Sequence, residues 1–400
     1  MFFKSKVPVS TDPAKIETLV TRSVIEIIPS GESLRKLLLS GKRLRIKLGI
    51  DPTSPNLHIG RAVPLLKLRD FQNLGHTVVF IIGDATGVVG DTSDKESERP
   101  MLSQADVEKN LAQYVAQAEK ILDKNLLEVR HNSEWLLKLN YAQIGDQADA
   151  FSVSDFIARD NIKRRLDDGK RVSLREVLYP LMQGYDSVAV QADVELGGTD
   201  QRFNLLAGRV LQGKAGQAPQ HILMSELIPG TDGRKMSSSW GNTINLNDVP
   251  EDMFGKVMSI PDPLIETYFI HCTRVPLDTV KSILTKGPRD AKFELASEIV
   301  RMYHGDKESK KAEEHFTSAF SKREAPSGVP VYEMSASELL VDVLVRNRVI
   351  ASKTEWRRLI NEGAVRIVGS DEKITDIDFQ PENGTIIRVG KHRFAAISRK

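Results

Sequence analysis

The chain has little of several features that would restrict its function at once. A single cysteine, Cys272, among 400 residues excludes an intramolecular disulfide and a metal site built from several cysteines. Long apolar runs are missing: the stretch VVFII has the length of a strand, and the first ten residues, MFFKSKVPVS, lack the apolar core of a secretory signal. We therefore expect a cytoplasmic protein that neither enters a membrane nor holds a metal ion with its own side chains.

Strong net charge is also absent. The sequence carries a formal charge of +2, so the molecule as a whole is not a polyanion binder and any surface for nucleic acid must be local. The hydrophobic and charged fractions, 40% and 28%, are those of an ordinary soluble globular protein. A length of 400 residues is enough for two or three domains of about 150 residues each.

Residues 43–90 predict an α/β fold. The stretch RLRIKLGI is a short apolar strand, RAVPLLKLRDFQNLG has the spacing of a helix that ends in a capping glycine, and HTVVFIIG is continuous in apolar residues, as buried parallel strands are. This order predicts a right-handed crossover in an open, Rossmann-like parallel sheet. Ligands of such sheets lie beyond the carboxyl ends of the strands. The segments after Ile50 and Ile82 are therefore expected at the ligand site.

The rest of the chain divides by composition. We expect a sheet domain over residues 1–245, with a helical insertion at about 100–170. A mostly helical domain follows over 246–325. A linker that contains Pro, Gly and Ser, residues 326–333, then leads to a small α+β domain over 334–400.

The segment DPTSPNLHIGRA, after the first strand, suits a phosphate ligand. The N-terminus of the following helix offers unpaired N–H groups and the positive end of a dipole. His58 can donate to a phosphate oxygen, and Gly60 lets a flat base approach the backbone. On spacing alone, an ordinary loop with a solvent-exposed histidine explains the segment better.

A second candidate is GRKMSSSWGN, residues 233–242. A cation among glycines and hydroxyls could close over a triphosphate, with Lys235 as a point charge on the β- or γ-phosphate. Alone, this stretch is better explained as a polar surface loop. Together, HIGR and KMSSS, about 175 residues apart and each near a predicted parallel strand, resemble the paired HIGH and KMSKS motifs of the class I aminoacyl-tRNA synthetases.

Two further stretches place polar groups near the same sheet. In YPLMQGYD, Tyr179, Gln183 and Asp186 share one face if the segment is helical, although Pro180 makes the start of that helix uncertain. A half-exposed helix with its polar side outward is an equally good explanation. In ELGGTDQRFNLL, Asp200 could accept from ribose hydroxyls or cap the next helix.

Taken in order across residues 45–240, these motifs resemble the tyrosyl-tRNA synthetases in their bacterial form, and residues 334–400 resemble the S-four-like RNA-binding domain at the end of those enzymes. The resemblance implies a ligase that activates L-tyrosine with ATP and then transfers the tyrosyl group to the 3′ end of tRNA(Tyr). It also implies Mg²⁺ bound with ATP, a homodimer, and anticodon binding by the helical domain over 246–325.

The resemblance further implies roles for the matched positions. Asp186 would accept a hydrogen bond from the phenolic hydroxyl of tyrosine, and the other tyrosine-binding residues would be Gly49, Asp91, Tyr179 and Gln183. The ATP-binding residues would be Asp51, His58, Gly60, Asp200, Leu227, Ile228, Lys235 and Ser238. The residues with a direct part in catalysis would be Thr53, His58, Gly60, Gln201 and Lys235. Within this last set, Thr53 and His58 would bind the γ-phosphate, and Gln201 would position the substrate carboxylate and the α-phosphate.

Three positions depart from the pattern of the family. Arg61 replaces the last histidine of HIGH. Ser238 replaces the second lysine of KMSKS, so we expect weaker contacts with pyrophosphate, partly offset by Arg234. Lys47 stands where one branch of the family carries a tyrosine that helps to bind the substrate hydroxyl. Recognition of that hydroxyl should therefore depend more heavily on Asp186.

The basic residues of the C-terminal domain are candidates for contact with RNA. Its net charge is too small to argue for RNA binding, but the positions of the cations are suggestive. The candidates are Lys353, Arg357, Arg358, Lys391 and Arg393. Without the family resemblance, a solvated helix face explains them better.

Two alternatives remain open. A tryptophanyl relative would share the fold and the chemistry, although Asp186 three residues after Gln183, together with GGTDQ, favours tyrosine. A catalytically silent RNA-binding protein on the same scaffold would fit the loss of lysine at position 238. The residues that argue against the silent scaffold are His58, Gly60, Asp91, Asp186 and Lys235.

Overall fold

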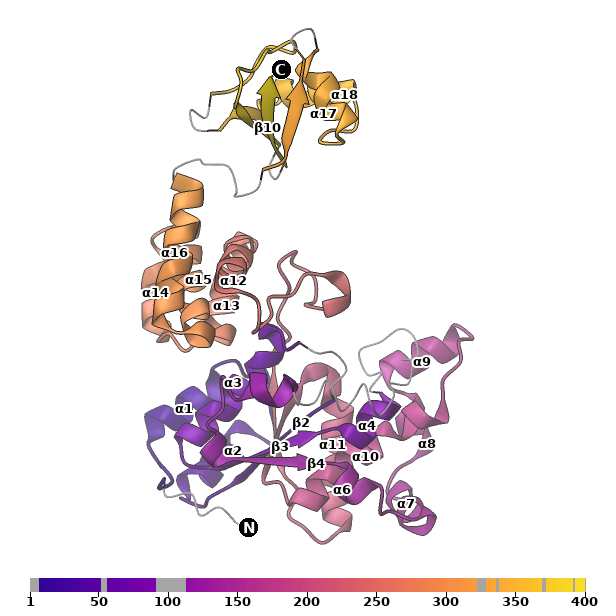
Figure 1. The fold of residues 1–400 in the computed structure, drawn as a ribbon. Coiled ribbons are helices and arrows are strands. Elements are labelled where there is room, and N and C mark those ends of the chain that lie inside the picture. The colour runs from indigo at the N-terminus through magenta and orange to yellow at the C-terminus, as the bar shows by residue number, and fades with distance from the viewer. Residues whose placement is uncertain are drawn as a thin grey trace. The chain divides into compact units, whose positions relative to one another are not determined.

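The computed structural model describes residues 7–51, 56–90, 113–321, 329–335, 338–368, 372–390 and 393–399. They form two compact units, one within residues 1–305 and one within 306–400 (Figure 1). The first unit is built around a mostly parallel sheet with helices, and the second contains a small sheet with helices. The predicted α/β class and the smaller α+β unit are confirmed.

A six-stranded sheet is the centre of the larger unit. Its strands are β1 (Glu26–Ile28), β2 (Arg45–Ile50), β3 (Thr77–Ile82), β4 (Leu127–His131), β5 (Val194–Gly198) and β6 (His221–Ser225). They lie in the order β1-β6-β5-β2-β3-β4, and each neighbouring pair is parallel except β1 with β6. Strand β2 therefore lies between β3, which follows it closely in sequence, and the distant β5.

The predicted crossover is present as β2, helix α3 (Ile59–Asn73) and β3. Five consecutive residues of β3, 78–82, are fully buried, as the continuous apolar run indicated. Gly75 follows the helix with φ +83°, and a Cβ there would collide with the carbonyl oxygen of Pro8. The helix thus ends where its capping glycine was predicted.

The helices of the larger unit fall into two groups along the chain. Around the sheet are α1 (Pro13–Thr21), α2 (Gly31–Leu39), α4 (Asp84–Val89), α6 (Ser133–Leu136), α7 (Tyr141–Ala148), α8 (Val153–Ile157), α9 (Asp160–Asp167), α10 (Leu174–Val190) and α11 (Arg202–Lys214). After the sheet come α12 (Pro250–Met258), α13 (Ile265–Cys272), α14 (Leu277–Leu284) and α15 (Pro288–His304). None of the helices in the described ranges is long and apolar enough to span a membrane.

Two of these helices, α10 and α11, lie side by side (Figure 1). Gly184 allows their close approach, because a Cβ at that position would lie 3.0 Å from the backbone carbon of Ala207. Helix α10 contains Pro180 in its interior, so the uncertain start of this helix is resolved: it begins at Leu174, capped by Ser173. Tyr179, Gln183 and Asp186 are therefore all helical.

One strand differs from the expected organisation. Residues Leu127–His131, within the segment predicted as a helical insertion at about 100–170, form β4 and pair with β3 at the edge of the sheet. All five residues of β4 are half-buried, so the segment has neither the continuous apolar run of a central strand nor a fully buried face. The predicted domain boundaries themselves remain predictions.

The smaller unit contains a four-stranded sheet. Its strands are β7 (Val331–Met334), β8 (Val365–Ile367), β9 (Ile386–Val389) and β10 (Arg393–Arg399), and its helices are α16 (Asp306–Ser321), α17 (Leu340–Arg346) and α18 (Lys353–Asn361). The sheet order is β7-β10-β9-β8, with β7 parallel to β10 and the other pairs antiparallel. Trp356 of α18 is fully buried in its core and donates to the carbonyl oxygen of Ile377 at 2.9 Å.

Candidate active site

A cavity of about 540 Å³ opens at the carboxyl ends of β2, β3, β5 and β6. This is the edge of the sheet at which a ligand was predicted. The predicted site residues that line this cavity are Gly49, Asp51, His58, Gly60, Tyr179, Gln183, Asp186, Asp200, Gln201, Leu227, Ile228, Lys235 and Ser238. Two others, Thr53 and Asp91, lie outside the described residues.

His58 forms the N-cap of α3. Its Nδ1 accepts from the backbone N–H of Arg61 at 3.3 Å, so the proton of the neutral ring is on Nε2. The side chain is 8% exposed. Burial, with a smaller contribution from the charge of Arg61, lowers the pKa of His58 to about 3. The imidazole therefore stays neutral near pH 7 and presents an N–H donor rather than a charge.

The start of α3 touches the loop that carries KMSSS. A Cβ on Gly60 would lie 3.1 Å from Nδ1 of His58 and 3.3 Å from Sδ of Met236, which is buried. His58 also forms a β-bridge with Asn245, just after that loop. The two motifs, far apart in sequence, are therefore held together.

The KMSSS loop is organised around Asn242. Its Nδ2 donates to Asp232 Oδ1 at 2.8 Å and to the carbonyl oxygen of Lys235 at 3.1 Å, and its Oδ1 accepts from the backbone N–H of Ser237 at 2.9 Å. A Cβ on Gly230 would collide with this amide. Asn242 was not singled out from the sequence, although it ends the quoted stretch GRKMSSSWGN. It fixes the backbone on both sides of Met236.

Lys235 crosses from this loop toward the end of β5. Its Nζ lies 3.5 Å from Oδ2 of Asp200, with 39% and 23% of the two side chains exposed. The pair joins the cation predicted for phosphate to the carboxylate predicted for ribose. At this distance and exposure the contact is weak, so a nucleotide could displace it at little cost.

The two arginines near the site differ in position. Arg61 lines the cavity, in the first turn of α3, where a cation opposes the helix dipole. Arg234 donates to Asp232 and stacks 5.0 Å from the ring centroid of Trp240. Arg234 itself is not among the lining residues of the cavity, and its guanidinium is engaged by Asp232 and by Trp240. The arrangement gives no support to the expectation that Arg234 offsets the missing lysine at position 238.

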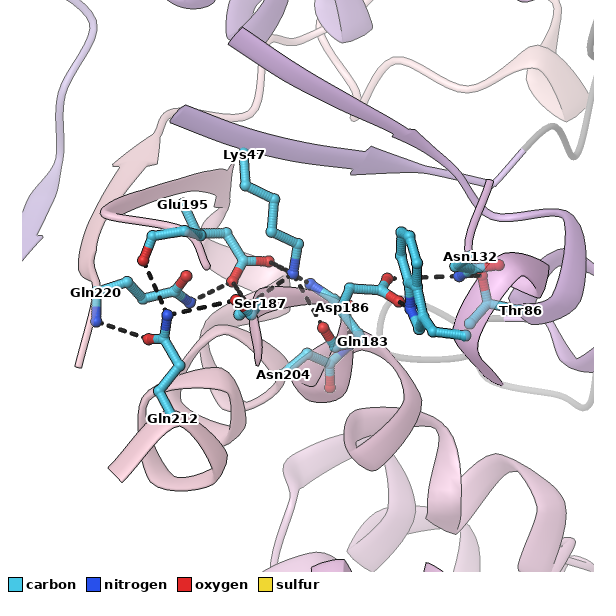
Figure 2. Close-up of polar contacts among 12 residues, drawn as sticks. Lys47, Thr86, Asn132, Gln183, Asp186, Ser187, Glu195, Asn204, Gln212 and Gln220 are labelled. Atoms are coloured by element: carbon cyan, nitrogen blue, oxygen red, sulfur yellow. Dashed lines mark hydrogen bonds and ion pairs between the residues drawn. The ribbon is translucent and has the colours of Figure 1, made fainter. Parts of the chain in front are cut away.

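At the other part of the cavity, the carboxylate of Asp186 points inward and is 3% exposed. Its Oδ1 accepts from Nε1 of Trp135 at 2.8 Å, and its Oδ2 from Nδ2 of Asn132 at 3.4 Å (Figure 2). Burial raises the pKa of Asp186 to about 7, opposed by the positive charge of Lys47 and by these two hydrogen bonds. A buried carboxylate with spare acceptor capacity is suited to accept a hydrogen bond from a hydroxyl group.

Tyr179 and Gln183, both predicted for tyrosine, belong to hydrogen-bond networks with neighbouring elements. Tyr179 donates to Asp51 Oδ2 at 2.9 Å, and Thr86 donates to the other oxygen of Asp51 at 2.7 Å. Thr86 in turn accepts from Asn132 at 2.9 Å. Gln183 accepts from Asn204 at 3.0 Å, which orients its amide. Asp51, predicted for ATP, is therefore hydrogen-bonded to a residue that was predicted for tyrosine.

Three residues of these networks were missed from the sequence: Thr86, Asn132 and Trp135. Thr86 follows β3, and Asn132 and Trp135 follow β4. The signal that could have found them is their place after the carboxyl ends of strands, but it requires β4 to be recognised as part of the sheet.

The basic residues of the smaller unit are mostly paired. Lys353 lies 2.6 Å from Asp342, Arg358 lies 3.1 Å from Glu362, and Arg393 lies 2.9 Å from Glu355. Arg357, on the same helix as Lys353 and Arg358, is exposed. Lys391 lies outside the described residues. The exposed face of α18 thus carries cations whose charge is partly balanced by neighbouring carboxylates.

Comparison with known proteins identifies the family. The family model of class I tRNA synthetases (W and Y) matches residues 39–321, and that of the SYY-like C-terminal domain of tyrosine–tRNA ligases matches 322–397. The chain is 46% identical to the tyrosine–tRNA ligase of Thermotoga maritima, over 96% of this chain and 98% of that protein. It is 43% identical to that of Carboxydothermus hydrogenoformans, over 95% and 96% of the two chains.

Solved structures agree on the fold. The truncated mitochondrial tyrosyl-tRNA synthetase of Aspergillus nidulans aligns with a TM-score of 0.65 at 23% identity, covering 76% of this chain and 94% of that one. The tyrosyl-tRNA synthetase of Archaeoglobus fulgidus in complex with L-tyrosine gives 0.61 at 21% identity, over 76% of this chain and all of that one. With its cavity, its two linked motifs and these relatives, the chain belongs to the class I tRNA synthetases, in the branch of the tyrosine–tRNA ligases.

Proposed function

We propose that this chain activates L-tyrosine with ATP to tyrosyl-adenylate and pyrophosphate, then transfers the tyrosyl group to the 3′ end of tRNA(Tyr). The observation that carries the proposal is one cavity lined both by a buried carboxylate, Asp186, and by the polar groups His58, Asp200 and Lys235. Two substrates held in a common cavity can react without a protein nucleophile.

Tyrosine would bind with its ring along α10. The phenolic hydroxyl would donate to Asp186, which is held by Trp135 and Asn132. Tyr179 and Gln183 would bind the ammonium group together with Asp91, beside Gly49. Phenylalanine would exclude water from the buried carboxylate without replacing the hydrogen bond from the phenol, and an unmade hydrogen bond at a buried polar group costs about 1–3 kcal/mol, more when the group is charged.

ATP would bind across the start of α3 and the KMSSS loop. Leu227, Ile228 and Gly60 would contact the adenine, and Asp200 the ribose hydroxyls. His58, as a neutral donor, and Thr53 would bind the γ-phosphate. The chain would hold no metal of its own, and the Mg²⁺ that accompanies ATP would neutralise part of the phosphate charge.

The tyrosine carboxylate would then attack the α-phosphorus in line while pyrophosphate leaves. Gln201 would position the carboxylate and the α-phosphate. Negative charge grows on the phosphate oxygens during this step, so donors fixed in advance, such as Nε2 of His58 and the ammonium of Lys235, lower the barrier. The second step needs the terminal ribose of the tRNA at the same carboxyl group.

Exchange of labelled pyrophosphate into ATP tests this proposal. Run separately with tyrosine, tryptophan and phenylalanine, the assay should give exchange with tyrosine. Exchange with tryptophan alone would move the chain to the tryptophanyl branch. No exchange with any of them would support the catalytically silent scaffold.

The proposed homodimer has support in the surface of the larger unit. Four large apolar side chains between residues 137 and 174 are strongly exposed: Leu137 by 76%, Tyr141 by 94%, Val153 by 75% and Leu174 by 71%. Apolar side chains of this exposure, close together in the sequence, favour contact with another protein. A second copy of this chain is the proposed cover, with one tRNA crossing both subunits.

Sedimentation velocity checks the dimer. The wild type should sediment as a particle of twice the chain mass of 44.6 kDa. The double variant Tyr141→Glu and Val153→Glu should sediment as a monomer, because each buried glutamate would lose its hydration. Val249→Glu, at an exposed apolar residue outside the segment, is the control and should stay dimeric. A monomeric wild type would contradict the proposal.

The smaller unit is proposed to contact tRNA through the exposed face of α18. Reversing the charge of Arg357 and Arg358 to glutamate should raise the KM for tRNA about tenfold or more and flatten its dependence on salt, because each phosphate contact releases counterions. Tyrosine-dependent pyrophosphate exchange should stay unchanged. Lys36→Glu, an exposed cation on α2 outside the helical domain expected to bind the anticodon, is the matched control. Equal effects of both changes on tRNA would count against this face.

A further inference from the structure

A buried ion pair adjoins the tyrosine site, and none of the roles above uses it. Lys47 on β2 and Glu195 on β5 stand directly opposite each other in the paired strands. Their Nζ–Oε1 distance is 2.8 Å, and their side chains are 0% and 1% exposed. Removing two charges from water is costly, and apolar residues of similar size often replace such pairs without loss of stability. Stability alone therefore does not account for the pair.

The ammonium of Lys47 has all three protons engaged. Besides Glu195, it donates to the carbonyl oxygen of Gln183 at 2.9 Å and to Oγ of Ser187 at 2.8 Å (Figure 2). Lys47 thus has no proton left for a substrate hydroxyl, although it stands where a branch of the family has a hydroxyl-binding tyrosine. Its contacts are instead with helix α10.

Glu195 contacts the same turn of α10 as Lys47 does. Its Oε2 accepts from Ser187 at 2.9 Å and from Gln220, and its Oε1 accepts from Nε2 of Gln183 at 3.3 Å. Gln183 and Ser187 bracket Asp186, three residues before it and one after it. The ion pair therefore contacts the turn of α10 that carries Asp186, the residue proposed to bind the phenol.

We propose that the Lys47–Glu195 pair is the positioning element of the tyrosine site: it fixes turn 183–187 of α10 against the sheet and sets the balance of charge around the Asp186 carboxylate. This inference rests on the proposed function and extends it. Lys47 and Glu195 act through Gln183, Ser187 and Asp186 and touch neither substrate.

The two charges affect Asp186 in opposite directions. Burial is the main cause that raises its pKa to about 7; the charge of Lys47 lowers the pKa, and that of Glu195 raises it. The other carboxylates on elements around α10 include Asp51, bonded to Tyr179 and Thr86, and Asp84 of α4, which accepts from Ser133 and lies 3.4 Å from His131. Helix α6 carries Glu134, which accepts from Arg130. Helix α11 contributes the neutral Asn204.

Because Lys47 and Glu195 shift the pKa of Asp186 in opposite directions, removing one or the other should shift the pH profile in opposite directions. A pair that only stabilised the fold would not produce this result. The value of kcat/KM for tyrosine, measured by pyrophosphate exchange at saturating ATP over pH 5.5–9, reports the ionisation of the enzyme before tyrosine binds. Because Asp186 accepts a hydrogen bond from the phenol best when it is ionised, kcat/KM of the wild type should fall as the pH is lowered. Titration of ATP itself is common to all variants, so the differences between variants are the readout.

The acid limb is the part of the pH profile in which kcat/KM falls as the pH is lowered. Lys47→Met removes a charge that lowers the pKa of Asp186, so it should move this limb to higher pH by about one unit. Glu195→Gln removes a charge that raises that pKa, so it should move the limb to lower pH. Both should raise the KM for tyrosine more than the KM for ATP. Lys47→Arg, which keeps the charge, should restore the position of the limb. The matched control is Arg165→Met, which breaks another buried ion pair on α10, with Glu176 at 2.7 Å, away from the cavity lining. It should lower the melting temperature and leave the limb in place.

The proposal is overturned if both pair variants move the limb in the same direction, if neither moves it, or if the KM for ATP rises as much as that for tyrosine. A variant that fails to fold is recognised by its melting curve, and Lys47→Arg with Glu195→Gln then carry the comparison. Absence of tyrosine-dependent exchange in the wild type would be a failure of the proposed function and is separate from these outcomes.

Discussion

Replacing Asp186 by alanine should lower kcat/KM for tyrosine about 10³-fold in pyrophosphate exchange, while the KM for ATP stays within about threefold of the wild type. The side chain contacts Trp135 and Asn132, neither of which belongs to the residues proposed for ATP. A loss confined to one substrate follows from this separation of contacts. The two Michaelis constants, measured on the same preparation, check the prediction.

The size of the effect follows from two losses. A hydrogen bond from the phenol to a carboxylate contributes about 1.5–3 kcal/mol, and the bound phenolic O–H, now without an acceptor in a buried pocket, costs about 1–3 kcal/mol. Their sum is about 4 kcal/mol, and each 1.4 kcal/mol is about tenfold in rate. Phenylalanine makes neither interaction, so its activation should change little and discrimination between the two amino acids should collapse.

Two further variants test whether the loss is specific to the carboxylate of Asp186. Asp186→Asn keeps the shape of the side chain but replaces one acceptor by a donor, and it should lose almost as much activity toward tyrosine. Glu176→Gln changes another buried carboxylate of α10 that does not line the cavity, and it should spare the KM for tyrosine. Equal losses of tyrosine and ATP binding in Asp186→Ala would mean that Asp186 is not in the tyrosine pocket.

Local patterns predicted the parts of the site that lie at the ends of strongly apolar strands. Strand β2 alternates apolar residues with Arg45, Lys47 and Gly49, whereas β3 is continuous in apolar residues, and the crossover between the two strands follows from their order in the chain. The sequence placed His58, Gly60 and Lys235 at one site through two motifs, and they do line one cavity. Asp186 was placed by the spacing of polar residues on a helix, and the helix is present.

What local patterns could not predict depends on contacts between distant segments. Lys47 was noticed as a departure, but its partner Glu195 lies 148 residues later in the chain, and their pairing is set by the register of β2 with β5. Trp135 and Asn132 follow an edge strand whose residues are all half-buried and thus give no strong pattern. Asn242 acts through hydrogen bonds to backbone groups, which side-chain patterns do not reveal.

Replacing Lys235 by alanine should slow the formation of tyrosyl-adenylate about 10²-fold or more and leave the affinity for tyrosine unchanged. In the structure its ammonium makes a weak, partly exposed contact with Asp200, which a nucleotide can displace at little cost. Charge on the leaving pyrophosphate develops in the transition state, and a cation that meets it there lowers the barrier without tightening the ground state. Single-turnover measurements at saturating ATP separate the rate of this step from binding.

The neighbouring arginine supplies the control for Lys235. Arg234 carries the same charge one residue earlier, but its guanidinium is bonded to Asp232 and stacked on Trp240. Arg234→Ala should therefore change the rate less than about threefold, since a side chain with its donors engaged elsewhere adds little to transition-state charge stabilisation. A rate unaffected by Lys235→Ala would remove the loop from the mechanism. Equal slowing by both variants would mean that the loop acts through its summed charge, because only one of the two cations lines the described cavity.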